Sequence, residues 1–323
     1  MSEVKKIAVL TSGGDSPGMN AAIRAVVRSG IAQGLDVQGI ERGYSGLLEE
    51  RFLTMDTHGV SETIQRGGTI LFTARCPEFV ERETQEKAAE ILRKHEIDGL
   101  VVIGGDGSFR GAQALARLGV NVIGIPGTID LDIACTDYTI GFDTAVNTAM
   151  EAIDKIRDTS SSHERCSIVE VMGRSAGYIA MVCGIATGAE DILLPELYDG
   201  DEQAIIDHVI DNRKKGRKHH LIINAEGVGH STSMARRIEA ATGVETRATI
   251  LGYLQRGGSP SSRDRFYASL MGSRAVDLLI AGKSCRIVVF KDGRCTDVDI
   301  EEGLAMKKEI PESIRRLTSL LAR

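Results

Sequence analysis

Three short segments that combine glycine with aspartate constrain the fold of this chain more than any other feature of its 323 residues. They are TSGGDSPGMN (11–20), VVIGGDGSF (101–109) and IPGTIDLD (125–132), and each contains or follows an apolar run that predicts a buried strand. Glycine lets the backbone approach a phosphate, and aspartate can hold the Mg²⁺ that neutralises it or accept a proton from an attacking hydroxyl. Three such loops at the strand ends of one sheet predict a polyphosphate site and a phosphoryl-transfer enzyme.

The spacing of apolar runs and helical patterns predicts an α/β protein with mainly parallel sheets. Strands are expected at 5–12, 37–43, 99–105 and 120–127, and helices after the 13–19 loop, at 84–96 and at 111–119. Strands separated by helices of about 10–15 residues favour a parallel sheet covered on both faces. Ligands of such sheets bind at the carboxyl ends of the strands, where the three loops fall.

A second α/β set is expected after a long amphipathic helix at 144–166. Its predicted elements are strands at 167–174, 191–196, 220–229 and 248–258, the last returning toward the first domain, and helices from about 175 and at 202–215. The length also favours two domains. We therefore expect two similar doubly wound domains with the active site in the cleft between them. The first domain would be 1–140, with 257–305 packing back on it, and the second domain 141–256.

Composition excludes several classes of function. A net charge of −6 and the absence of Trp argue against nucleic-acid binding. No apolar run is long enough to span a membrane, and the N-terminus lacks a signal-peptide core. Six cysteines without CxxC spacing indicate reduced thiols rather than disulfides or zinc ligands. A cytoplasmic enzyme is the expectation.

Each motif also has a plain structural reading. The GGDG turn could simply close a strand, and the loop around Gly14 could be only a strand-to-helix turn. Asp130 and Asp132 are two apart, so in an extended loop they share a face, but either could instead cap a helix. Five arginines beside short Gly or Thr loops favour anion binding, although each alone is more often a surface residue: Arg75, Arg165, Arg174, Arg247 and Arg256.

Ten motifs carry a resemblance to a known family. They are TSGGDSPGMNAAIR, RGGTILFTARCPEF, VVIGGDGS, PGTID, TIGFDTA, IRDTSSSHER, EVMGR, AEGVG, ETRATILG and QRGGSP, and they occur in order over nearly the whole chain. Together they resemble the bacterial ATP-dependent 6-phosphofructokinases. The resemblance implies phosphorylation of fructose 6-phosphate to fructose 1,6-bisphosphate, a step of glycolysis. In that family the aspartate matching Asp130 takes the proton of the 1-hydroxyl as it attacks the γ-phosphate of MgATP.

The resemblance also implies sets of site residues. The catalytic set is Asp130, Arg75, Arg174, Thr128 and Gly14. The ATP set is Gly14, Arg75, Cys76, Gly105, Asp106, Gly107 and Ser108, with Mg²⁺ on Asp106 and Asp132. The sugar-phosphate set is Thr128, Ile129, Asp130, Arg165, Met172, Gly173, Arg174, Glu226, Arg247, Tyr253, Leu254, Gln255 and Arg256. A homotetramer is implied because Arg165 and Arg247 would come from a neighbouring subunit.

An allosteric site for ADP or phosphoenolpyruvate is implied as well. Its matching residues are Arg24, Arg28, Arg157, Gly188, Glu190, Lys215, Arg217, Lys218 and His219. The Lys/Arg run at 212–220 has a simpler reading as a solvated basic helix end.

The chain departs from the family pattern at two positions. Leu131 replaces the asparagine of PGTIDND, and Tyr253 replaces a histidine that reaches the sugar phosphate. Tyr253 leaves open a related acceptor such as tagatose 6-phosphate or sedoheptulose 7-phosphate, and a weakly active regulatory paralogue is a third reading. Pyrophosphate-using members resemble GGDDS and PKTID, whereas Gly107 and Gly127 here predict open space for a nucleotide, so ATP is favoured as donor.

Overall fold

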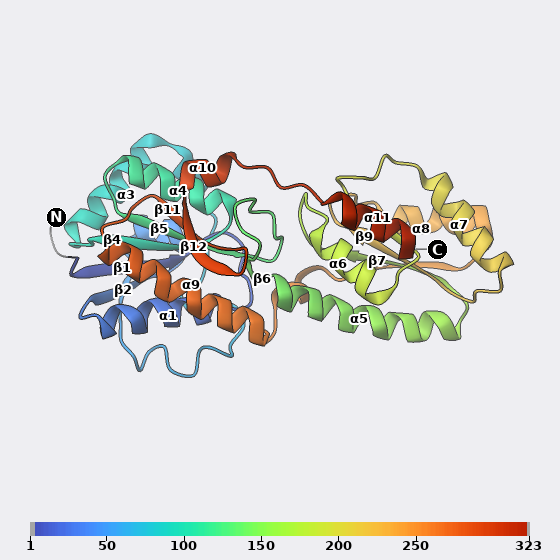
Figure 1. Ribbon diagram of the computed structural model, residues 1–323, viewed down its shortest axis with the longest axis horizontal. Helices are drawn as coiled ribbons and strands as arrows, with labels where there is room; N and C mark the ends of the chain where they lie inside the picture. Colours follow the sequence, from blue (N-terminus) through green and yellow to red (C-terminus); the bar gives the residue numbers. More distant parts are fainter. Residues whose placement is uncertain (1–3, 322–323) are drawn as a thin grey trace. The chain divides into compact units, whose positions relative to one another are not determined.

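The computed structural model describes residues 4–321 and divides the chain into two compact units (Figure 1). The first unit runs to Thr144 and resumes over Arg256–Lys308, and the second comprises Ala145–Gln255 and the segment from Glu309 onward. The chain therefore leaves the first unit after Thr144, returns to it at Arg256 and leaves it again after Lys308.

The first unit is built on an eight-stranded sheet. Its strands are β1 (Lys6–Thr11), β2 (Asp36–Ile40), β3 (Phe52–Met55), β4 (Gly99–Gly104), β5 (Val122–Thr128), β6 (Ile140–Gly141), β11 (Arg286–Lys291) and β12 (Arg294–Asp299). The order is β12-β11-β5-β4-β1-β2-β3, with β6 beside the end of β5. Among the described residues only the edge strands β3 and β12 pair antiparallel, so the predicted parallel sheet is confirmed.

Helices cover both faces of this sheet because its strands are apolar on both sides. Side chains such as Ile7 and Val101 pack toward α1 (Met19–Ala32) and α9 (Ser262–Ile280). Their neighbours Ala8 and Leu100 pack on the opposite face. That face carries α2 (Gly43–Leu48), α3 (Arg82–Lys94), α4 (Asp106–Arg117) and α10 (Ile300–Ala305), and the short helix η1 (Pro77–Val80) precedes α3.

The second unit repeats the plan with an all-parallel sheet of four strands. The strand order is β10 (Thr246–Ile250), β7 (Cys166–Val171), β9 (His220–Ala225) and β8 (Asp191–Leu193). The helices are α5 (Phe142–Ser162), α6 (Tyr178–Thr187), α7 (Glu202–Lys214), α8 (Ser231–Thr242) and α11 (Glu312–Leu321). Ile168 and Ile222 pack with Ile205 of α7 and Ile238 of α8 in its core. The prediction of two doubly wound α/β domains is thus confirmed.

Several predicted strands extend beyond the observed ones, which end at Ile40, Val171, Leu193 and Ala225, and the largest error is in the last strand of the second unit. The strand expected at 248–258 ends at Ile250 and pairs with β7 inside the second unit, after which the chain forms the short helix η2 (Gly252–Arg256). The return to the first unit is therefore made through a helical turn, in which Tyr253 is 82% exposed.

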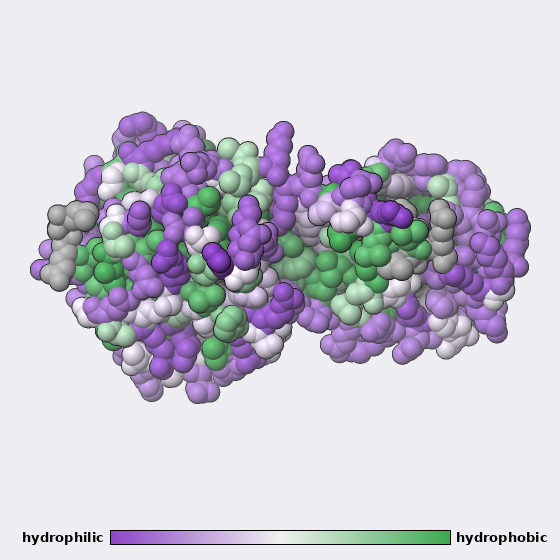
Figure 2. Space-filling view, in the orientation of Figure 1, coloured by the Kyte–Doolittle hydropathy of each residue, from purple (hydrophilic) through white to green (hydrophobic). Residues whose placement is uncertain are grey.

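Hydrophilic residues cover much of the visible face of each unit, with apolar patches between them (Figure 2). Within residues 4–321, the structure contains no helix that combines the length and the apolar character required to cross a bilayer. All six cysteines are free thiols in the structure.

Candidate active site

The three glycine–aspartate loops meet at one edge of the first unit's sheet. They follow β1, β4 and β5, which are neighbours in the strand order. The register places Thr11 opposite Ile103 and Gly104 opposite Pro126, so the three strands end at the same level. The Ser12 N–H donates to the Ile103 carbonyl at 2.9 Å, which ties the first loop to the second. Parallel strands thus bring together segments that are far apart in the chain.

The GGDG loop is closely packed at its first glycine. A Cβ on Gly104 would lie 2.5 Å from Ser108 Oγ and 2.6 Å from the Ser12 carbonyl oxygen. Below the loop, the hydroxyl of buried Tyr44 donates to the Ser108 carbonyl at 2.6 Å, and burial raises the pKa of Tyr44. Only glycine fits at position 104, and α4 begins directly afterward at Asp106. The loop therefore presents the N-terminus of a helix, which attracts phosphate.

The two glycines that were expected to leave space for a nucleotide differ in their surroundings. A Cβ on Gly107 would meet nothing within 4 Å, so the space there is open. A Cβ on Gly127 would lie 3.0 Å from Ile103 and 3.1 Å from Met19. The expectation of open space is wrong for Gly127, because its missing side chain would point into the apolar core.

Asp130 lies in a buried turn at the end of β5. It is 3% exposed, and its N–H donates to Thr128 Oγ1 at 3.1 Å. Leu131, the next residue, has a φ of +54°. The loop is therefore not extended, and the argument that placed Asp130 and Asp132 on one face of an extended loop is wrong.

The left-handed backbone at Leu131 gives a stability prediction. A left-handed conformation costs a side chain other than Gly, Asn or Asp roughly 1–2 kcal/mol. We expect Leu131→Gly to have a free energy of unfolding about 1 kcal/mol above that of Leu131→Ala, the reverse of the usual order. Urea denaturation of the two variants measures the difference. Equal stability, or a more stable alanine variant, would contradict the inference that the backbone of Leu131 is strained.

The segment that carries Arg75 and Cys76 is tied to the first loop. Thr11 Oγ1 donates to the Phe72 carbonyl at 2.7 Å, and Thr73 Oγ1 donates to the Gly13 carbonyl at 2.7 Å. Arg75 is exposed, and the half-buried Cys76 thiol has its pKa raised to about 11, mainly by burial. Cys76 is therefore a neutral thiol at physiological pH, suited to contact and not to nucleophilic attack.

Arg256 lies over the first loop. Its Nη1 donates to the Asp15 carbonyl at 2.8 Å, and a Cβ on Gly14 would lie 2.6 Å from the same nitrogen. The sequence assigned Arg256 to the second domain, whereas the structure groups it with the first unit. A larger residue at position 14 would therefore displace this guanidinium.

In the second unit, a turn after β7 gathers several predicted site residues. The carboxylate of Glu226 accepts hydrogen bonds from the N–H groups of Gly173, at 3.1 Å, and of Arg174. Buried Gln255 accepts from the Met172 N–H at 3.2 Å. Both Gly173 and Arg174 have positive φ values, and this turn exposes the Arg174 side chain. The roles of Glu226 and Gln255 in the structure are to hold the Met172–Arg174 turn.

Two further arginines share one partner. Glu245 pairs with Arg165 at 2.8 Å and with Arg247 at 2.6 Å, and these hydrogen bonds hold the pKa of Glu245 below its usual range, with that from Arg165 the larger cause. Tyr253 and Leu254 are 82% and 66% exposed.

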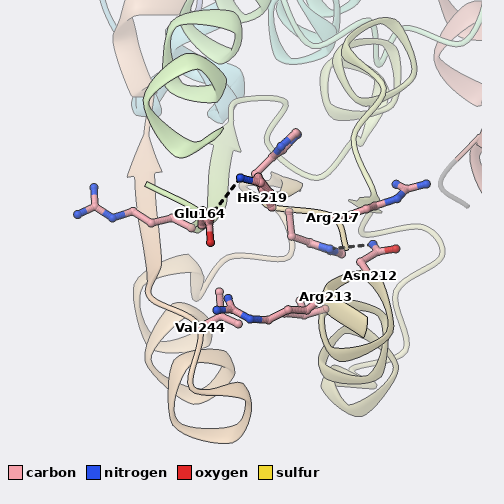
Figure 3. Close-up of a pocket in the computed structure, with 10 residues that line it drawn as sticks. Glu164, Asn212, Arg213, Arg217, His219 and Val244 are labelled. Atoms are coloured by element: carbon pink, nitrogen blue, oxygen red, sulfur yellow. Dashed lines mark hydrogen bonds and ion pairs between the residues drawn. The ribbon is translucent and has the colours of Figure 1, made fainter. Parts of the chain in front are cut away.

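The predicted effector residues fall in both units. Arg24 and Arg28 lie on α1 in the first. In the second, Glu190 pairs with Arg217 at 3.3 Å, and Arg157 donates to the carbonyl of Thr187, beside Gly188. Figure 3 shows a pocket that contains Arg217, Lys218 and His219 together with Glu164, which pairs with Lys218 at 3.2 Å. Its volume is about 10 Å³, close to the minimum for one water, so the residues of one chain do not by themselves enclose a nucleotide here.

Two charged residues that contact the segment following Asp130 were not predicted from the sequence. Lys308 Nζ donates to the carbonyls of Leu131 at 2.9 Å and Thr136 at 3.2 Å, and burial lowers its pKa. Asp264 is completely buried, and burial raises its pKa against the opposing effect of its hydrogen bonds. Lys308 has no local signal, whereas the SSRD run at the start of α9 is a helix-capping pattern that could have indicated Asp264.

Residues 6–279 match a family model described as Phosphofructokinase. The chain belongs to the phosphofructokinase family. An ATP-dependent 6-phosphofructokinase of Clostridium botulinum (strain Hall) is 56% identical over 321 residues, which are 99% of this chain and 100% of the relative. The resemblance inferred from the motifs is thus confirmed.

Solved phosphofructokinases share the fold. The Saccharomyces cerevisiae structure superposes with a TM-score of 0.86 at 36% identity and covers 98% of this chain. The Pichia pastoris phosphofructokinase in the T-state gives a TM-score of 0.89 at 33% identity over 100% of this chain. The chain spans 48% and 38% of the lengths of those two yeast chains.

Proposed function

We propose that this chain transfers the γ-phosphoryl group of ATP to the 1-hydroxyl of D-fructose 6-phosphate, the committed step of glycolysis. The observation that carries the proposal is the meeting of the three loops at one sheet edge, with Asp130 buried among them. The full-length relative at 56% identity is named as an ATP-dependent 6-phosphofructokinase. The enzyme class is therefore ATP:D-fructose-6-phosphate 1-phosphotransferase.

Asp130 is assigned as the general base. Phosphoryl transfer needs little covalent help, so positioning and a group that accepts the hydroxyl proton provide most of the catalysis. The hydrogen bond from the Asp130 N–H to Thr128 Oγ1 fixes the backbone of the base. Arg75 and the N–H groups of the 104–108 loop are assigned to the phosphates of ATP, where charge develops.

Mg²⁺ is assigned to Asp106 and Asp132. Among residues 4–321 no three acidic, histidine or cysteine side chains form a metal cluster. The donor set nevertheless fits, because Mg²⁺ in kinases keeps several waters and binds one or two carboxylates plus the substrate phosphates. Asp106, whose side chain is 43% exposed, pairs with Arg110 at 3.1 Å and would exchange that partner for the ion. When bound, Mg²⁺ neutralises the phosphate charge.

The acceptor is assigned to the second unit and to Arg256. The Met172–Arg174 turn, Glu226 and the exposed side chains of η2 are the residues proposed to bind the sugar phosphate. Tyr253 can donate a hydrogen bond but carries no positive charge. We therefore expect Tyr253 to bind the sugar phosphate more weakly than a histidine would. Tagatose 6-phosphate and sedoheptulose 7-phosphate therefore stay alternative acceptors.

The first experiment is a kinase assay with Mg²⁺ and fructose 6-phosphate that compares ATP with pyrophosphate as donor. The proposal expects ATP-dependent formation of fructose 1,6-bisphosphate and little turnover with pyrophosphate. The same assay with the two other sugar phosphates tests acceptor choice. No turnover with any pair would favour a regulatory paralogue.

The open space at Gly107 gives a prediction about the donor. An aspartate there meets no neighbour within 4 Å of its Cβ, so Gly107→Asp should fold normally. Its carboxylate would repel the nucleotide phosphates, and we expect kcat/KM for ATP to fall at least about 10-fold, or about 1.4 kcal/mol. Steady-state kinetics measures this, with Gly107→Ala as the control of similar backbone effect. An unaltered kcat/KM for ATP would place the nucleotide elsewhere.

Oligomeric state, regulation and localisation are proposed from the family resemblance. The homotetramer is proposed from that resemblance alone, and exposed apolar side chains such as Ile250, Leu254 and Phe266, which are 58%, 66% and 64% exposed, support a subunit interface. Arg165 and Arg247 would then serve a neighbouring subunit's acceptor. The effector is proposed to be ADP or phosphoenolpyruvate, and the cytoplasmic localisation stays a prediction.

A further inference from the structure

The Asp130 loop belongs to a longer segment, 128–144, that two charged side chains from the C-terminal part of the first unit contact. Asp264, at the start of α9, is fully buried. Lys308 is half-buried and is the last residue of the first unit. Neither side chain is a candidate substrate ligand, so their burial calls for another explanation.

Asp264 binds the far end of the segment through four hydrogen bonds. Its Oδ1 accepts from Tyr138 Oη at 2.6 Å and from the Gly141 N–H at 2.7 Å. Its Oδ2 accepts from the Thr144 N–H at 2.9 Å and from Thr144 Oγ1 at 2.5 Å. An aspartate with both oxygens used this way fixes three positions of the segment at once.

The hydrogen bond between Asp264 and Gly141 is linked to Asp130 through two further contacts. Gly141 is the register partner of Thr128 in the β5–β6 pair. Thr128 Oγ1 accepts the Asp130 N–H at 3.1 Å. Gly141 itself allows no substitute, because a Cβ there would lie 2.5 Å from Ser16 Cβ. A shift of Gly141 would therefore be passed to the turn that carries the base.

Lys308 binds the near end of the segment. Its ammonium group donates to the Leu131 carbonyl at 2.9 Å and to the Thr136 carbonyl at 3.2 Å. The first of these carbonyls belongs to Leu131, the residue that follows Asp130. The left-handed backbone conformation of Leu131 is otherwise unfavourable. The Asp264 carboxylate therefore accepts hydrogen bonds from N–H and hydroxyl groups at one end of the segment. The Lys308 ammonium group donates hydrogen bonds to carbonyls at the other end.

We propose that Asp264 and Lys308 are positioning residues, which hold segment 128–144 so that the Asp130 carboxylate keeps the place that phosphoryl transfer requires. This proposal rests on the proposed function of Asp130. Displacement of a reacting group by about 1 Å can lower a rate about 100-fold. The two residues therefore act on kcat through the base and have no contact of their own with substrate.

The test compares Asp264→Asn and Lys308→Met with a matched control, Asp297→Asn. In Asp264→Asn the new NH₂ faces the backbone N–H of Gly141 or of Thr144, depending on its orientation, so at least one hydrogen bond is replaced by a contact between two donors. Asp297 is also largely buried, and it accepts from Arg274 of α9 at 3.0 Å and from Arg286 of β11 at 2.9 Å rather than from segment 128–144. We expect kcat to fall about 10- to 100-fold in each of the first two variants, with KM for ATP within about 3-fold, and kcat of the control within about 2-fold.

Amide hydrogen exchange over 128–144 supplies a readout that is independent of catalysis. Exchange should rise in Asp264→Asn and Lys308→Met, and not in Asp297→Asn. If Asp264→Asn fails to fold, Thr144→Val and Thr144→Ser replace it, and the serine, which keeps the hydroxyl, should retain the kcat that the valine loses. Unchanged exchange, or a wild-type kcat in a variant with loosened exchange, would overturn the proposal. Absence of turnover in the wild type would instead reject the proposed function.

Discussion

Asp130→Ser is expected to lose at least about 10²- to 10⁴-fold in kcat, because general-base catalysis contributes about that much. The buried carboxylate sits in a turn fixed by Thr128, and serine at this position cannot accept the hydroxyl proton of the acceptor. Binding of both substrates should persist, so KM for ATP and for fructose 6-phosphate should change little. Steady-state kinetics with both substrates varied measures the two effects separately.

The controls for this prediction separate chemistry from folding. Asp130→Asn keeps the shape of the side chain and removes only its basicity, so it should be as inactive as the serine variant. Asp154→Asn, at an exposed position on α5, should have the wild-type kcat. A kcat for Asp130→Ser within about 10-fold of the wild type would mean that another group accepts the proton.

Most inner strands of the sheets could be predicted from the sequence because they are buried on both faces, whereas the edge strands β3 and β12, which are more exposed, were not predicted. Strands such as β4 and β5 are continuous apolar runs that lead into glycine-rich loops, and their lengths of 6 and 7 residues are typical of buried strands. The error after β10 has a physical reason. Leu251, Tyr253 and Leu254 extend the apolar run of β10 in the sequence, but Tyr253 and Leu254 are exposed, and the chain closes into a helical turn there.

The candidate site could be predicted only in part. Glycine and aspartate spacing located the three loops, because their backbone requirements are local. The left-handed φ of Leu131 was not predicted, since leucine rarely adopts it. Lys308 is 177 residues from the carbonyl it binds, and Asp264 is 123 residues from Gly141. Such contacts depend on which elements pack together, and no local pattern in the sequence records them.

Gly173→Ala is expected to have the largest effect on the second unit. Gly173 has a φ of +143°, and a Cβ there would lie 2.3 Å from the Ala176 carbonyl oxygen. Because backbone and not a flexible side chain is met, the Met172–Arg174 turn must shift, and we expect the free energy of unfolding to fall by about 2–4 kcal/mol. Urea denaturation measures that loss.

The same displacement has a functional consequence, because the turn directs Arg174 and is held by Glu226. If the turn binds the acceptor, Gly173→Ala should raise KM for fructose 6-phosphate at least about 10-fold while KM for ATP stays near its wild-type value. Gly200→Ala is the matched control: its φ is +92° and a Cβ there meets nothing within 4 Å. That variant should lose only about 1–2 kcal/mol of stability and none of its affinity for the acceptor. An equal rise in KM for the sugar phosphate and the nucleotide, or no rise at all, would remove the Met172–Arg174 turn from the acceptor site and leave Arg256 as the basic anchor that the first unit provides.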